Sequence, residues 1–105
     1  MIDLDVKTRQ QVQRILNQYL PEAEVRLVGS RARRGAKRQA DIDLLVMRSK
    51  PLLPRERALL NTAFEESDIP FKVDLLEWEL LTIAFRLRLL KGGAPLLCRP
   101  ARQPQ

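Results

Sequence analysis

Two aspartates, Asp41 and Asp43, stand at the start of an apolar run near the middle of the chain. Side chains two residues apart on a strand point to the same face, roughly 7 Å apart at the backbone. Carboxylates held in this way repel each other unless a cation lies between them. Oxygen ligands combined with substrate phosphates are the environment that Mg²⁺ prefers. The pair therefore indicates magnesium and a phosphate-bearing substrate, such as a nucleoside triphosphate.

A glycine and a serine, Gly29 and Ser30, follow the apolar stretch that precedes these aspartates. Gly29 lacks a Cβ, so the backbone there can turn sharply and lie close to a ligand. Ser30 is a favourable N-cap, and a helix that begins there would direct its free N–H groups toward a phosphate. The two residues are therefore expected to cradle the substrate phosphates.

Five of the eight residues from Arg31 to Arg38 are arginine or lysine. Arg31 and Arg33 lie nearest the Gly-Ser turn, and we expect them to bind phosphate oxygens. The rest of the run is equally compatible with a solvated turn or with contacts to a nucleic-acid backbone. Aromatic residues do not alternate with the basic ones, so a base-stacking surface for DNA or RNA is not supported.

A third aspartate, Asp74, lies within an apolar segment that is predicted to be a strand. An unpaired carboxylate is costly to bury in such a segment. A salt bridge to one of the many arginines would satisfy it, but a metal site would explain Asp41, Asp43 and Asp74 together. A lone Gly-Ser or Asp-x-Asp is usually a turn or a surface feature, whereas their combination at this spacing favours a catalytic site.

The hydrophobic pattern predicts the elements that would position these residues. A helix from a Thr8–Gln11 capping box to Leu20 would end at Pro21. The other expected elements are a strand at 23–28, a helical turn from Ser30 to Gly35, a strand at 41–47, a helix from Pro54 to about Glu66, a strand at 71–76 and a helix from Trp78 to Leu90. This order predicts an α/β (α+β) fold, with a small mixed β-sheet and helices packed on it.

Composition sets further bounds on the chain. Its 105 residues predict one domain at 1–93 and an irregular basic tail at 94–105. The net charge of +6 favours polyanionic partners. The absence of histidine excludes Ser-His triads and leaves carboxylates to bind any metal. The single cysteine, Cys98, suits a cytoplasmic location, and no N-terminal apolar segment suggests a signal peptide or a membrane span.

The predicted helix from Trp78 to Leu90 carries two apolar stripes where one would suffice to face its own sheet. The first stripe is made by Trp78, Leu81, Ala84, Phe85 and Leu89, and the second by Leu80, Ile83, Leu87 and Leu90. We expect one stripe to stay exposed and to mark a homodimer or partner interface. The alternative is that the tail, with Leu96 and Leu97, folds back over it.

The motifs resemble those of a known superfamily over residues 8 to 90. Gly-Ser-Arg-Ala-Arg at 29–33, Asp-Ile-Asp-Leu at 41–44 and the block from Glu66 to Trp78 are similar to the signature of DNA polymerase beta nucleotidyltransferases. More narrowly, they resemble the minimal nucleotidyltransferases (MNT) that are paired with HEPN proteins in toxin–antitoxin modules. The chain departs from that pattern at Arg34, where a glycine is usual, and at Ala40, where a small polar residue is usual.

The resemblance implies a nucleotidyltransferase fold in which Asp41, Asp43 and Asp74 converge and bind two Mg²⁺ ions. It implies ATP as the donor and a tyrosine of a cognate HEPN toxin as the AMP acceptor, which would make this chain the antitoxin. In that reaction Asp74 would bind the metal nearest the acceptor hydroxyl, and Gly29 and Ser30 would hold the β- and γ-phosphates.

Two other functions remain open from the sequence. One is a catalytically degenerate binding module that neutralises a partner or binds operator DNA, which the three intact aspartates argue against and the Arg34 and Ala40 departures keep open. The other is a different acceptor, such as an antibiotic or a tRNA end, although enzymes of those kinds usually carry an additional acceptor domain. Magnesium-dependent ATP binding by the isolated chain would separate an enzyme from a binding module.

Overall fold

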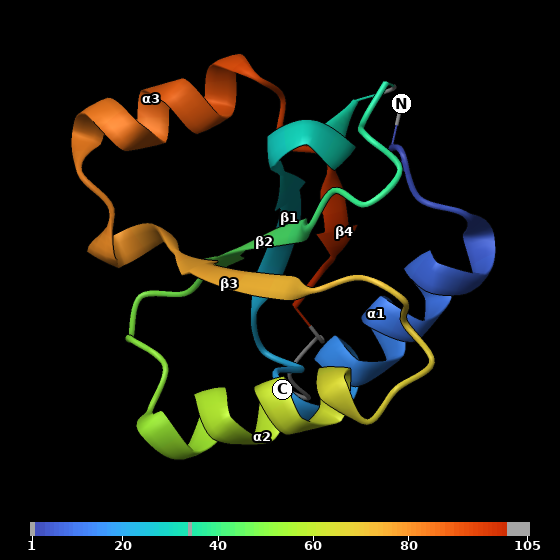
Figure 1. The fold of residues 1–105 in the computed structure, drawn as a ribbon. Coiled ribbons are helices and arrows are strands. Elements are labelled where there is room, and N and C mark those ends of the chain that lie inside the picture. Colours follow the sequence, from blue (N-terminus) through green and yellow to red (C-terminus); the bar gives the residue numbers. More distant parts are fainter. Residues whose placement is uncertain (1, 34, 101–105) are drawn as a thin grey trace.

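A computed structural model describes residues 2–33 and 35–100 of the chain (Figure 1). A mixed four-stranded sheet lies at the centre, with α1 and α2 on one face and α3 on the other. The elements are α1 (Val6–Tyr19), β1 (Glu24–Val28), η1 (Gly29–Ala32), β2 (Ile42–Met47), α2 (Pro54–Glu65), β3 (Val73–Glu77), η2 (Trp78–Leu80), α3 (Ile83–Lys91) and β4 (Leu96–Cys98). The predicted fold class is confirmed.

The strand order of the sheet is β3-β2-β1-β4. β1 pairs antiparallel with β2 and with β4, whereas β2 and β3 run parallel. A parallel pair needs a crossover connection, and α2 supplies it. The parallel pairing places the start of β2 beside the start of β3, which is where two of the predicted functional aspartates lie.

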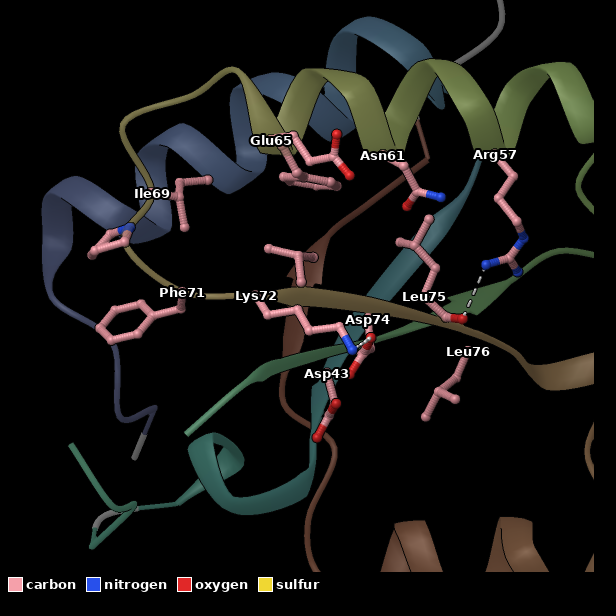
Figure 2. A pocket seen from close by; sticks show the side chains of 13 residues that line it. Asp43, Arg57, Asn61, Glu65, Ile69, Phe71, Lys72, Asp74, Leu75 and Leu76 are labelled. Carbon is pink, nitrogen blue, oxygen red and sulfur yellow. Dashed lines mark hydrogen bonds and ion pairs between the residues drawn. The ribbon is translucent and has the colours of Figure 1, made fainter. Parts of the chain in front are cut away.

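The two faces of β2 differ at the end where Asp43 lies, whereas Leu45, farther along on the Asp43 face, is fully buried. Ile42, Leu44 and Val46 are buried in a cluster that includes Leu16 of α1 and Leu60 of α2. Burying an aliphatic side chain of this size contributes roughly 1.5–3 kcal/mol. Because the core is built on this face, the carboxylate of Asp43 is turned to the other one (Figure 2).

The first and last of the predicted helices show the main differences from the predictions, and the predicted turn from Ser30 to Gly35 is the shorter η1. α1 begins at Val6 after an Asp5 N-cap, so Thr8 lies inside the helix, where it is buried and does not cap it. The predicted helix from Trp78 to Leu90 is interrupted, because η2 ends at Leu80 and α3 begins only at Ile83. Thr82 causes the second start: its Oγ1 accepts a hydrogen bond from the N–H of Phe85 at 3.2 Å, which is the bond of an N-cap.

The prediction of an irregular tail is wrong for residues 96–98, which form β4 against β1. Leu97 and Cys98 are buried, and the Leu97 carbonyl accepts a hydrogen bond from Gln13 Nε2 at 2.8 Å. Pro95 and Pro100 flank the strand, which an edge strand tolerates. Residues 101–105 of the predicted tail lie outside the described residues. Among the described residues no helix has the length and apolar character to cross a membrane.

Candidate functional site

Asp43 of β2 and Asp74 of β3 occupy the same register position of the parallel pair. Residues in register on neighbouring strands project to the same face, and Figure 2 shows both carboxylates on the side of β3 away from α2. Asp43 is half-buried and the Asp74 side chain is 40% exposed. The structure therefore brings two of the three predicted metal ligands together at an accessible position.

The electrostatics of this pair favour a bound cation. Burial raises the pKa of Asp43, and the charges of Asp74 and Asp41 raise that pKa further, while Lys72 lowers it. The Lys72 ammonium lies 3.6 Å from Asp74 Oδ1 and offsets part of the negative charge. A divalent cation between the carboxylates would relieve this repulsion more fully, and hard oxygen ligands fit Mg²⁺.

The third predicted ligand, Asp41, precedes β2 and is exposed. In the described part of the chain, no group of three or more acidic, histidine or cysteine side chains is arranged to hold a metal ion. The structure thus assembles the Asp43–Asp74 pair and leaves Asp41 outside it, because Asp41 has not yet entered the strand pairing. Its charge still reaches the pair, since it contributes to the raised pKa of Asp43.

The turn at Gly29 is built around the Asp43 side chain. Gly29 has a φ of +74°, a conformation that favours glycine, and a Cβ placed there would collide with the Asp43 carboxylate. Val28, the preceding residue, pairs with Asp43 across β1 and β2. The exposed Ser30 follows in η1. The predicted phosphate turn and the predicted metal ligand are therefore in contact.

Arg31 does not lie where the phosphate prediction puts it. Its side chain is buried, with only 6% of the residue exposed. Its guanidinium donates from Nε to the Ala40 carbonyl, from Nη1 to the Asp3 carbonyl and from Nη2 to the Arg38 carbonyl, at 2.8, 3.0 and 3.2 Å. The guanidinium also stacks 3.9 Å from the centre of the Phe71 ring. Since these contacts turn it inward, Arg31 is a structural clamp and the prediction that it binds phosphate is wrong.

Arg33 is the remaining predicted phosphate ligand, and it is exposed. It follows η1 at the start of the loop that leads to β2, and the loop residues Lys37 and Arg38 are exposed as well. Arg34, one of the two departures from the MNT pattern, lies outside the described residues. The exposed basic side chains leave the loop able to meet an anionic ligand.

A cleft of about 720 Å³ opens between α2 and β3 and reaches the Asp43–Asp74 pair. Figure 2 shows Arg57, Asn61 and Glu65 in a row along α2, above the edge of β3. Sequence reasoning did not single out this row. The spacing of these three residues in the sequence could have indicated it, because polar residues four positions apart share one helix face.

Known proteins resemble the chain in both sequence and fold. A family model described as Polymerase beta, Nucleotidyltransferase matches residues 10–102. The probable protein adenylyltransferase MntA of Haemophilus influenzae is 40% identical over 85 residues, which cover 79% of this chain and 75% of that relative.

Solved structures share the fold at lower identity. A toxin–antitoxin structure with AMP-PNP matches with a TM-score of 0.71 and 20% identity, covering 87% of this chain and 73% of that chain. The tri-AMPylated Shewanella oneidensis HEPN toxin in complex with MNT antitoxin gives a TM-score of 0.66 and 18% identity, covering 89% and 71%. The resemblance inferred from the motifs at 29–33 and 41–44 is confirmed: the chain belongs to the polymerase beta nucleotidyltransferase family.

Proposed function

We propose that this protein is a magnesium-dependent adenylyltransferase that moves AMP from ATP to a hydroxyl of a cognate HEPN toxin and thereby acts as its antitoxin. The observation that carries the proposal is the register of Asp43 and Asp74 beside the Gly29 turn. The 40% identity to a probable protein adenylyltransferase supports the choice of donor and of a protein acceptor.

Each residue has a distinct role in this proposal. Asp43 and Asp74 would hold Mg²⁺, with Asp74 as the ligand on the acceptor side, and Asp41, which stands outside this pair just before β2, would join them as a ligand of the two ions when Mg²⁺ binds. Bound Mg²⁺ neutralises charge on the triphosphate and on the departing pyrophosphate. Gly29 and Ser30 lie against the β- and γ-phosphates, and Arg33 contacts phosphate oxygens from the exposed loop.

The proposed reaction breaks a phosphoanhydride bond of ATP and forms a phosphodiester bond to the acceptor. The acceptor oxygen, which we propose is a tyrosine hydroxyl, forms a bond to the α-phosphorus of ATP as the bond from that phosphorus to the β-phosphate oxygen breaks. Pyrophosphate leaves, and Asp74 accepts the hydroxyl proton. The side chain of Asp74 suits this role because it is 40% exposed at the mouth of the cleft.

Transfer of label from α-labelled ATP to the HEPN partner tests the proposal directly. Wild-type protein should label the partner only in the presence of Mg²⁺, and Asp43→Asn should reduce labelling to background. Asp68→Asn makes the same chemical change at an exposed loop position and should retain full transfer. Full transfer by Asp43→Asn would rule out the proposed site.

One observation favours a second function, binding of operator DNA by a catalytically degenerate module. Arg33, Lys37 and Arg38 are all exposed on the loop before β2, where they can meet a phosphate backbone. In that case Asp43→Asn should leave neutralisation of the partner and DNA affinity unchanged. Loss of neutralisation in this variant would instead favour the enzyme.

A further inference from the structure

β3 forms an outer edge of the sheet, because it stands last in the strand order. The N–H of Ile42 donates to the Lys72 carbonyl at 2.9 Å, so the polar backbone groups of Lys72 and Asp74 face β2. The backbone groups of the alternate residues, Val73, Leu75 and Glu77, therefore point outward. Within the described part of the chain, this row receives one side-chain hydrogen bond, from Arg57 Nη1 to the Leu75 carbonyl at 3.4 Å.

The cleft beside this edge has the dimensions of an extended peptide. Its upper wall is the row of Arg57, Asn61 and Glu65 on α2, and its lower wall is the edge of β3 (Figure 2). The row spans about 12 Å by the rise of a helix. That length corresponds to about four residues of extended chain. The cleft volume of about 720 Å³ is sufficient for a segment of this size.

The register of β3 determines where a paired segment would place its side chains. A strand that bonds to the outward groups of Val73 and Leu75 has one residue directly opposite Asp74. Directly opposed residues project to the same face, with Cβ atoms about 5 Å apart. That face is the one on which Asp74 and Asp43 lie. A hydroxyl side chain at this position, or diagonal to it, would lie beside both carboxylates.

We propose that an extended segment of the acceptor protein adds to the outer edge of β3 as a fifth strand and so presents its hydroxyl to Asp74 and Asp43. The inference deepens the proposed function and rests on it. A polypeptide suits this edge because alternating N–H donors and C=O acceptors match a peptide backbone. Glu65 lies in the cleft wall, and its carboxylate would repel the phosphates of a nucleic-acid strand. Binding of a nucleic acid in the cleft is therefore disfavoured.

Amide hydrogen exchange tests strand addition at the backbone groups themselves. In the free chain, the outward N–H groups of Val73 and Leu75 should exchange rapidly. When the HEPN partner is bound, both should slow by about tenfold or more, since each gains a hydrogen bond. Unchanged exchange at both residues in a formed complex would overturn the proposal. So would equal protection by a single-stranded RNA in place of the partner.

Two variants test the same edge by kinetics. Val73→Pro removes an outward N–H and suits an edge strand, whereas its control Val73→Thr keeps the N–H and a β-branched side chain. Asn61→Trp fills the cleft from an exposed position of α2. Its control, Thr62→Trp, places the same side chain at an exposed position that does not line the cleft. The test variants should raise the KM for the partner about tenfold and leave Mg²⁺-ATP affinity unchanged.

The outcomes separate this inference from the proposed function. If wild-type protein labels the partner and both Val73→Pro and Asn61→Trp keep the wild-type KM for it, strand addition is wrong and the adenylyltransferase stands. If the Val73 and Leu75 amides are protected by the partner while wild-type protein transfers no label, strand addition is supported and the proposed reaction is wrong.

Discussion

The corner around Gly29 and the helix α3 lie on the same side of the sheet but are built in opposite ways. At the corner, Gly29 is fitted against Asp43, and Arg31 binds three carbonyl groups. Every residue of α3 lies in the described part of the chain, and none of them is buried. The difference indicates that the corner beside Asp43 is closely packed, whereas α3 presents apolar side chains that no described residue covers.

The most exposed part of η2 and α3 is the second of the two predicted stripes, although Phe85 of the first stripe is 37% exposed as well. Leu80, Ile83, Leu87 and Leu90 are 64, 74, 63 and 48% exposed. The alternative, a cover formed by Leu96 and Leu97, is not what the structure shows, because both residues lie in β4 at the far edge of the sheet. An exposed apolar row of this length indicates an interaction surface. Its use in a homodimer or in a partner complex stays a prediction.

The largest expected effect is on complex formation. Replacing Ile83 by Glu and Leu87 by Lys in one double variant should abolish the partner complex or homodimer in light scattering. Exposed positions contribute little to folding, so the free energy of unfolding should change by about 0.5 kcal/mol or less per site. A variant that no longer folds cooperatively would show instead that the stripe belongs to the core. In that case α3 would not differ from the packed corner around Gly29.

A smaller but substantial effect is expected from the clamp. Arg31→Ala would leave the carbonyls of Asp3, Arg38 and Ala40 without their guanidinium partner and should lower the free energy of unfolding by about 2–4 kcal/mol. The measurement is urea denaturation. Arg33→Ala is the matched control, because Arg33 is exposed, and it should change stability by no more than about 0.5 kcal/mol. Equal losses in the two variants would contradict the structural role of Arg31.

A modest loss of ATP affinity is expected when the turn at Gly29 and Ser30 is altered. Ser30→Ala removes one hydrogen bond to a charged group and should weaken ATP binding by about 1 kcal/mol or somewhat more. Because Ser30 is exposed, the free energy of unfolding should change less than the binding energy does. Calorimetry with Mg²⁺-ATP measures the first quantity and denaturation the second. Unchanged ATP affinity would exclude the Ser30 hydroxyl from the phosphate cradle.

The smallest predicted effect concerns the charge on Asp43. Because folding raises the pKa of Asp43 above its ordinary value of 3.8, the ionised carboxylate opposes folding at neutral pH. This penalty is absent below the ordinary pKa, grows as the pH rises from the ordinary pKa toward the folded-state pKa, and is constant above it. Metal-free Asp43→Asn should therefore have a higher Tm than wild type at pH 7, and the difference should vanish near pH 3. A lower Tm for the variant at pH 7 would mean that the carboxylate stabilises the fold.

Local patterns in the sequence predicted much of the fold and part of the site. The apolar alternation around Ile42–Val46 predicted which face of β2 is buried, and the spacing in the helix from Trp78 predicted an exposed stripe. Local patterns could not predict that Asp43 and Asp74 are adjacent, because a helix separates their strands in the sequence. That prediction came from the fold that the family resemblance implied. The strand β4 was not predicted, because a short segment between prolines carries little pattern of its own and forms only against β1.

The sequence by itself determined the types and spacing of the groups proposed for chemistry, because a strand or a turn expresses its periodicity over a few neighbouring residues. Arg31 and Arg33 are the same residue type in the same motif, and no local pattern separates them. Only the tertiary structure decided that Arg31 is buried beneath Phe71 while Arg33 is exposed. It also decided that β3 is an edge strand, because burial and strand neighbours depend on which distant segments pack together.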